Sequence, residues 1–548
     1  MNRHALLFTA AALAFVLGAC SGQGDLSLKH INAAKLKERI AVLANDSLEG
    51  RGPGTRGEER TIAYLISQYT QLGLEPGGDH GTYVQKVPLI GVRIDPSVTM
   101  DIAHGKQSVQ LKFPDDFIAR TGVYEPVVSV KNADMVFVGY GIVAPEYGWD
   151  DYKGVDVAGK ILLMMNDDPN MGDLTFFAGK GRTYYGRWTY KYEIAAQKGA
   201  LGAIVIHTNE SAGYPYQVVR ASWSQENFDM KNPGEHRDIK LKGWTTEEAT
   251  QRYLALAGFD LKQLVASAQR KEFKPLALGL TASTTMKYTI RRMETHNVIG
   301  ILRGSDSKLK DEYVVFSAHH DHFGIGVPVD GDSIYNGALD NASGVSMMMA
   351  VAEEFSAMKE KPRRSLLFAA VAAEEKNLLG SRRFAERSTV SLASIAANIN
   401  IDAINILGKT KDIVCLGAER STLKKDVEAT AAAMGLVVRP DAFPEQGSFY
   451  RSDHFSFAKM GIPALSIDGG TEYIGKPATY GKEMADEFNK KHYHQPSDEL
   501  RDGWNYEGAI QQGEFAVRLA QRLANALSMP VWHKGDEFEA AGLKLGKK

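Results

Sequence analysis

The chain contains very little cysteine and has almost no net charge. Only Cys20 and Cys415 occur among 548 residues, so the fold has to be stable without a disulfide framework. We expect Cys415 to be a buried structural thiol. The 64 Lys and Arg residues nearly balance the 66 Asp and Glu residues, and no basic stretch stands out. The sequence therefore gives no electrostatic reason to expect nucleic acid as a partner.

Apolar runs long enough to span a membrane are also absent, and even the apolar start of the chain is short for a span. That start combines a positive charge, the segment ALLFTAAALAFVLG and the small residues Gly18 and Ala19 before Cys20. It resembles a bacterial lipoprotein signal, in which residues 1–19 are removed and the cysteine is lipidated. An ordinary secretory signal or a buried apolar helix is the alternative. The resemblance implies export and a lipid anchor on Cys20 in the cell envelope, in the outer membrane facing the periplasm because Ser21 follows.

The rest of the chain divides into three stretches, because 548 residues exceed what one hydrophobic core supports. Residues 20–125 begin with two helical patterns that flank a glycine-rich loop. Residues 126–285 contain short apolar strands separated by Gly, Pro and aromatic loops. From 286 to 548 apolar strands alternate with helical stretches, which predicts an α/β domain with a mostly parallel sheet covered on both faces.

Acidic residues and histidines follow the apolar strands of the last stretch. The carboxyl ends of strands in such sheets are where binding sites lie. Singly, each of these residues has an ordinary explanation, such as a solvated surface or a turn. Gathered in one cleft they would repel unless cations lay among them, and neutral imidazoles with carboxylates are the ligands of a hydrolytic zinc site. The residues are His319, His320, Asp321, His322, Asp340, Glu374, Glu375, Asp402, His492 and His494.

Five motifs carry a family resemblance. SAHHDHFG, GALDNASGV, AAEEKNLLGS, NIDAI and YHQPSDE resemble, in order and spacing, the co-catalytic zinc aminopeptidases, whose superfamily includes glutamate carboxypeptidase and the transferrin receptor. LEGRGPGTRGEE is similar to the family's N-terminal loop. DVAGKILLMMND with QKGALGAIVIH resembles an inserted protease-associated domain, which we place at 126–285. The resemblance implies a three-layer α/β sandwich with a mixed, mostly parallel sheet (the zinc exopeptidase fold) plus a mainly β insert.

The resemblance also implies the ligands of two zinc ions. One ion would be bound by His319 and Asp402 and the other by Glu375 and His494. Asp340 would bridge the two ions. Its peptide bond to the next residue is often cis in this family.

Other residues receive roles from the same resemblance. Glu374 matches the general base, and Asp321 would orient His319 through its other ring nitrogen. Tyr493 is either a donor to the developing oxyanion or a packed aromatic residue. His320 and His322 would line the pocket or have no role. Arg451, Asp453 and His454 either form a structural network or lie at the edge of the substrate pocket, and we favour the structural network.

The implied function is that of an aminopeptidase acting on peptide substrates in the cell envelope. A carboxypeptidase or dipeptidase on the same scaffold is the enzymatic alternative, because the pocket groups that meet the charged end of the substrate decide which terminus is cleaved. A metal-free binding homologue is the non-enzymatic alternative, although every expected ligand is present. A glutaminyl cyclase fits less well, because its relatives normally lack the insert.

Overall fold

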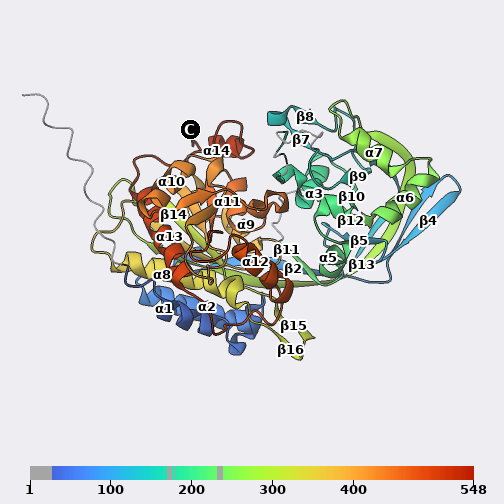
Figure 1. The fold of residues 1–548 in the computed structure, drawn as a ribbon. Helices are drawn as coiled ribbons and strands as arrows, with labels where there is room; N and C mark the ends of the chain where they lie inside the picture. The colour runs from blue at the N-terminus through green and yellow to red at the C-terminus, as the bar shows by residue number, and fades with distance from the viewer. Residues whose placement is uncertain (1–27, 170–175, 178, 180, 231–237, 548) are drawn as a thin grey trace, which may run out of the picture.

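Two lobes make up the molecule, and one long strand belongs to both (Figure 1). The computed structural model describes residues 28–169, 176, 177, 179, 181–230 and 238–547. Strand β13, Leu276–Leu302, pairs with strands of the smaller lobe up to Lys287 and with strands of the larger lobe from Tyr288 onward. The expected signal peptide and Cys20 lie outside the described residues. In the part that is described, no helix combines the length and the apolar character needed to cross a membrane.

The larger lobe is built on a mixed, mostly parallel sheet. Four neighbouring strands are parallel, in the spatial order β17 (Ser365–Val371), β14 (Tyr313–His319), β18 (Ile395–Asn400) and β21 (Ala464–Asp468). β13 pairs antiparallel with β17. Continuously buried, apolar strands are typical of a parallel sheet covered on both faces. The predicted α/β class is confirmed.

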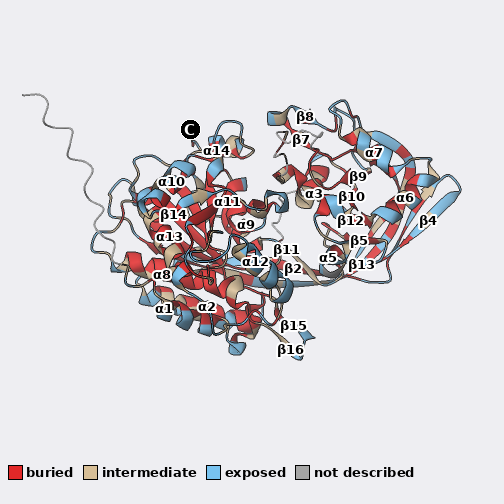
Figure 2. Ribbon diagram, viewed as in Figure 1, coloured by how far each residue is buried: buried red, intermediate tan, exposed pale blue. Residues whose placement is uncertain are grey.

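Alternate side chains of β14 pack against different helices. Val314 belongs to the apolar cluster that includes α8, Gly344–Ala357. Val315 belongs to the cluster on the opposite face, which includes α11, His454–Lys459. Because side chains alternate along a strand, the two faces each need a helical cover. The lobe is therefore a three-layer sandwich, with the buried strands between helices (Figure 2).

The smaller lobe has its own sheet. Its parallel strands are β6 (Val127–Phe137), β9 (Ile161–Met165), β10 (Gly202–His207) and β12 (Leu241–Thr246). Helices lie beside these strands, among them α3, Trp188–Gln197. The insert thus contains more helix than the expected mainly β domain.

This lobe also begins earlier than residue 126, where the sequence placed it. Strand β3, Thr99–His104, pairs with β13, and β5, Phe117–Arg120, pairs with β12. Exposed and buried side chains alternate along most of β3, so about half of the strand faces solvent. Such short amphipathic strands give a weak signal beside the apolar strands that follow. Cys415, in strand β19 (Asp412–Leu416) of the larger lobe, is buried and free, as expected.

Candidate metal centre

Four of the expected site residues lie at one edge of the larger sheet. His319 is the last residue of β14, Glu374 and Glu375 follow β17, and Asp402 follows β18. Because these three strands are parallel neighbours, their carboxyl ends meet at the same edge. The sheet therefore brings together side chains that are up to 83 positions apart in the sequence.

Asp340 joins the two expected histidine ligands. Its Oδ1 lies 3.2 Å from His319 Nε2, and its Oδ2 lies 3.3 Å from His494 Nε2. Each histidine also faces a second carboxylate. Asp402 Oδ1 is 3.3 Å from His319 Nε2, and Glu375 Oε2 is 3.3 Å from His494 Nε2. Two groups of three donors therefore share Asp340, each through a different oxygen atom.

The spacing of these donors fits zinc. Nitrogen and oxygen ligands bind Zn²⁺ at about 2.0–2.1 Å in tetrahedral sites, which places neighbouring ligands roughly 3.3–3.4 Å apart. The four nitrogen–oxygen distances of 3.2–3.3 Å are close to this. An N–H group shared between two acceptors makes two bent, weakened hydrogen bonds, so a cation between the three atoms explains nitrogens that face two carboxylates equally at least as well. Imidazole and carboxylate are also donor types that zinc accepts.

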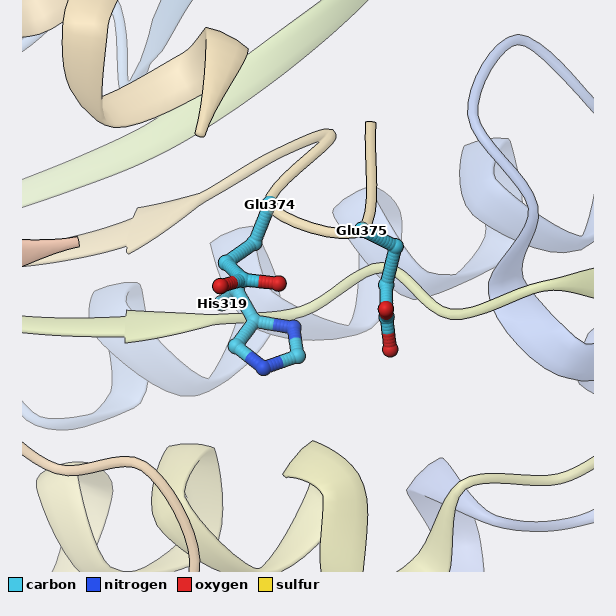
Figure 3. Close-up of side chains that lie close together, drawn as sticks. All are labelled: His319, Glu374 and Glu375. Carbon is cyan, nitrogen blue, oxygen red and sulfur yellow. The ribbon is translucent and has the colours of Figure 1, made fainter. Parts of the chain in front are cut away.

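Glu374 lies beside these donors without belonging to either group of three. Its carboxylate is near the imidazole of His319 and the carboxylate of Glu375, with the ligand atoms of the three residues within 4.8 Å of one another (Figure 3). Burial raises the pKa of Glu374 well above its usual range; His319 opposes this effect and Glu375 adds to it. A carboxyl group with a raised pKa is suited to take up and return a proton.

Asp321 contacts His319 in a different way from the one expected. His319 Nδ1 lies 3.2 Å from the main-chain carbonyl oxygen of Asp321, whereas the nearest carboxylate oxygen is 3.8 Å away. That oxygen instead accepts a 3.0 Å hydrogen bond from the main-chain N–H of Glu374. The carboxylate therefore positions the loop of Glu374, and the carbonyl group faces the imidazole.

The turn that carries Asp340 is fixed by the next residue. The Asp340–Asn341 peptide bond is cis, as the resemblance implied. The Asn341 side-chain oxygen accepts hydrogen bonds from the N–H groups of Gly344, at 2.8 Å, and Ala403, at 2.9 Å. Because Ala403 directly follows Asp402, one amide side chain links the segments of two candidate ligands.

Two residues that hold candidate ligands received no such role from the sequence. His322 Nδ1 is 2.7 Å from Glu375 Oε1. The buried Asp498 carboxylate accepts hydrogen bonds from the N–H groups of Leu339 and Asp340, both at 3.0 Å. The histidine cluster and the YHQPSDE motif marked the region, but nothing in their spacing shows which residue contacts which ligand.

Arg51 connects the N-terminal glycine-rich loop to the centre. The side chain is 1% exposed, and its Nε and Nη2 donate hydrogen bonds to the carbonyl oxygens of His320 (2.8 Å) and Gly337 (2.9 Å). His320 itself places Nε2 3.0 Å from the carbonyl oxygen of His296, away from the candidate ligands. The loop that resembles the family's N-terminal loop is thus a structural support.

Tyr493 stacks on a candidate ligand. Its ring centre lies 3.7 Å from that of His494, with 27° between the ring planes. Arg451 is exposed on the cleft, whereas Asp453 and His454 are completely buried. The oxyanion role of Tyr493 stays a prediction, and of the nearby segment Arg451 is the exposed residue on the cleft.

A cleft of about 1860 Å³ opens beside the centre. The larger lobe contributes Asp340, Glu374, Glu375, Asp402 and His494 to its lining. The smaller lobe contributes the opposite wall, including residues of β5 and α3. A volume of this size accommodates several amino-acid residues, since clefts of roughly 300–1,000 Å³ already hold drug-sized ligands.

The fold and the donor residues together define an α/β protein. Its candidate metal centre lies at the edge of the sheet where the carboxyl ends of the parallel strands meet. Residues 297–518, which contain all of the donors, match the family model "Peptidase family M28".

Proteins similar to this chain include two relatives matched by sequence and one solved structure. A probable glutamate carboxypeptidase of Arabidopsis thaliana is 23% identical over 77% of this chain and 59% of its own length. A probable zinc metalloprotease of Pyrenophora teres f. teres is 33% identical over 20% of this chain and 22% of its own length. The solved aminopeptidase of Aneurinibacillus sp. strain AM-1 has 20% identity and a TM-score of 0.48, over 91% of this chain and 95% of that one. The chain thus spans less than two thirds of either of the first two relatives.

Proposed function

We propose that this chain is a zinc-dependent aminopeptidase that hydrolyses the N-terminal peptide bond of peptides. The observation that carries the proposal is the pair of donor groups that share Asp340, with Glu374 beside them. The family M28 match over the same segment supports peptide hydrolysis. The name of the fungal relative supports zinc as the metal.

In this proposal the chain holds two zinc ions. His319 and Asp402 would hold one, Glu375 and His494 the other, and Asp340 would contact both. When bound, zinc supplies Lewis acidity toward the scissile carbonyl group and toward water.

The proton is then handled by the protein. Glu374, with its raised pKa, accepts the proton of the attacking water and returns it to the leaving amine. Asp321 contributes by accepting a hydrogen bond from the Glu374 main chain. Tyr493, at the rim of the centre, is the proposed donor to the developing negative charge on the carbonyl oxygen.

Zinc analysis combined with a substrate panel tests the proposal. The purified protein should contain two zinc ions per chain and cleave aminoacyl amides and short peptides with a free N-terminus. Acetylation of that N-terminus should abolish cleavage. A zinc-loaded protein that hydrolyses no peptide of the panel would contradict the proposal and favour a non-catalytic binding homologue.

One observation favours a carboxypeptidase or dipeptidase as the second candidate. Arg187 and Arg451 both line the cleft, and no carboxylate of the described chain lies within ion-pair distance of either. Arg451 is among the groups that lower the pKa of Arg187, so the two positive charges are close to each other. Such a pair suits a substrate's C-terminal carboxylate. Amidation of the C-terminus, in place of N-acetylation, would then abolish cleavage.

The cellular location belongs to the proposal as well. Export and lipid attachment at Cys20 are supported by the signal-like start of the chain. Metabolic labelling with radioactive palmitate should mark the full chain and leave the Cys20→Ser variant unlabelled. Labelling of both proteins, or of neither, would contradict the lipid anchor.

A further inference from the structure

The smaller lobe presents an arginine and three aromatic rings to the cleft. Arg120 ends β5, and its guanidinium carbon lies 3.9 Å from the ring centre of Trp223, the last residue of α5 (Tyr216–Trp223). Trp188 and Tyr192 of α3 complete the group, with ring centres 5.5–6.1 Å apart. All four side chains line the cleft that contains the candidate metal ligands. We call this group the Arg120 wall.

The hydrogen-bonding capacity of Arg120 is almost unused. A guanidinium group carries five N–H donors. Arg120 Nε is buried without a hydrogen-bond partner, and the one side-chain hydrogen bond of Arg120 to the described residues is a long one of 3.4 Å from Nη2 to the carbonyl oxygen of Ser222. Two other cations of the cleft are paired, Lys242 with Asp238 at 2.8 Å and Arg382 with Glu386 at 2.8 Å. Within the described ranges no carboxylate pairs with Arg120.

An unpaired, poorly hydrated guanidinium group is costly. Burial lowers the pKa of Arg120 to about 9, with Tyr192 and Asp229 opposing the effect. Stacking on Trp223 offsets part of the cost, because the face of an indole attracts a cation. The planar fork of N–H donors remains open toward an anion, and a carboxylate is the group that fits such a fork with two parallel hydrogen bonds.

We propose that the Arg120 wall binds a carboxylate of the bound peptide, away from the scissile bond. The guanidinium group holds the carboxylate, and the aromatic rings pack against the neighbouring apolar parts of the peptide. The carboxylate is that of an acidic side chain or of the C-terminus, which share the same chemistry. The inference rests on the proposed function for the identity of the ligand as a peptide, but binding at this wall requires no hydrolysis.

A binding experiment tests the wall without relying on catalysis. The zinc-loaded full chain is titrated in a calorimeter with three N-acetylated pentapeptides. The first contains one Asp and has a C-terminal amide, the second has Asn in its place, and the third is the Asn peptide with a free C-terminus. The difference in affinity between the first and second peptides gives the contribution of the side-chain carboxylate. The difference between the third and second peptides gives the contribution of the C-terminal carboxylate. Either carboxylate should improve binding about tenfold, as expected for a charge-assisted hydrogen bond.

Three variants test whether this difference in affinity comes from the Arg120 wall. Arg120→Met keeps the aliphatic contact with Trp223 and should abolish the preference for a carboxylate. Arg120→Lys keeps the charge without the fork and should leave a reduced preference. Arg220→Met removes a surface cation of the same lobe, paired with Asp115 at 3.0 Å, and should change nothing. Equal affinity of the wild-type chain for the three peptides, or an undiminished preference in Arg120→Met, would overturn the proposal.

The outcome is separable from that of the proposed function. A chain that binds carboxylate peptides through Arg120 but cleaves none would support the wall and contradict the peptidase. If Arg120→Met does not fold, the wild-type comparison of the three peptides and the Arg120→Lys variant still decide. An Arg120 that only packs against Trp223 would lower thermal stability on substitution and leave the ratio of the affinities unchanged.

Discussion

Ser452 Oγ donates a 2.5 Å hydrogen bond to Asp402 Oδ2, the carboxylate oxygen that does not face His319. Behind it, Asn400 Nδ2 donates to Ser452 Oγ at 2.8 Å, and Ser317 Oγ donates to Asn400 Oδ1 at 2.7 Å. Ser317, Asn400 and Ser452 are all buried. A chain of hydrogen bonds therefore runs from the middle of the sheet to a candidate metal ligand and fixes the orientation of its carboxylate.

Substitution of Ser452 should weaken metal binding without unfolding the protein. Ser452→Ala removes the partner of Asp402 Oδ2, and loss of such a supporting contact typically lowers metal affinity about 10–100-fold. Competition with a chromophoric chelator measures the affinity for zinc. Ser97→Ala is the matched control, because its exposed hydroxyl bonds only to the side chain of Asp95. The same zinc affinity in both variants would show that the hydrogen bond has no such role.

Glu374→Gln should separate metal binding from turnover. The amide keeps the size of the side chain but cannot accept a proton, so kcat should fall at least ~10³-fold while the zinc content is unchanged. Atomic absorption and steady-state kinetics on an aminoacyl amide measure the two quantities. Glu248→Gln, at an exposed position of helix α6 (Glu247–Leu256) in the smaller lobe, is the control. Turnover close to that of the wild type in Glu374→Gln would rule out the base role.

We expect His322 to support zinc binding at the position formed by Glu375 and His494. His322 Nδ1 lies 2.7 Å from Glu375 Oε1, and His322→Leu would leave the Glu375 side chain, which is 4% exposed, without this partner. We expect zinc affinity to fall about 10–100-fold at the position formed by Glu375 and His494. Dialysis against graded chelator followed by zinc analysis should then show the first ion released at a lower chelator concentration than in the wild type. Release of both ions at the wild-type concentration would speak against the contact.

Much of the larger lobe could be predicted because its strands are buried, mostly apolar and end in chemically distinctive residues. The parallel neighbours β17, β14 and β18 follow from the alternation of apolar strands and helices. The start of the smaller lobe could not be predicted in the same way. Strand β3 is half exposed, so its pattern resembles a surface loop, and its partner β13 lies far along the chain.

The candidate ligands could be predicted only as a set. Residue types and motif order pointed to His319, Asp340 and Asp402, and the structure places the carboxylates of Asp340 and Asp402 3.2 and 3.3 Å from His319 Nε2. The supporting contacts could not be predicted, since they depend on atom positions across the fold. Asp321 meets His319 through its carbonyl group, and Ser452 reaches Asp402 from another segment. A hydrogen bond between residues 50 positions apart leaves no local pattern in the sequence.

Glu58, in the first turn of α2 (Arg56–Gln71), makes stability depend on pH. Its side chain is 2% exposed and accepts hydrogen bonds from the N–H of Gly54, at 2.6 Å, and from the hydroxyl of Thr295. Burial raises its pKa from 4.5 to about 8, against these two hydrogen bonds. A pKa that is higher in the folded state means that the folded state binds the proton more tightly. The stabilisation is therefore complete below the unfolded pKa and is lost as the pH rises through the folded one.

The free energy of unfolding should accordingly fall between pH 5 and pH 8, by up to about 4 kcal/mol from this group. Glu58→Gln carries no titratable group there and should lose less stability over the same interval. Urea unfolding at both pH values measures the difference. Glu59→Gln, an exposed neighbour on the same helix, should behave like the wild type. Equal pH dependence in Glu58→Gln and the wild type would mean that Glu58 is already ionised in the folded protein at pH 5, with Thr295 and Gly54 holding the charge.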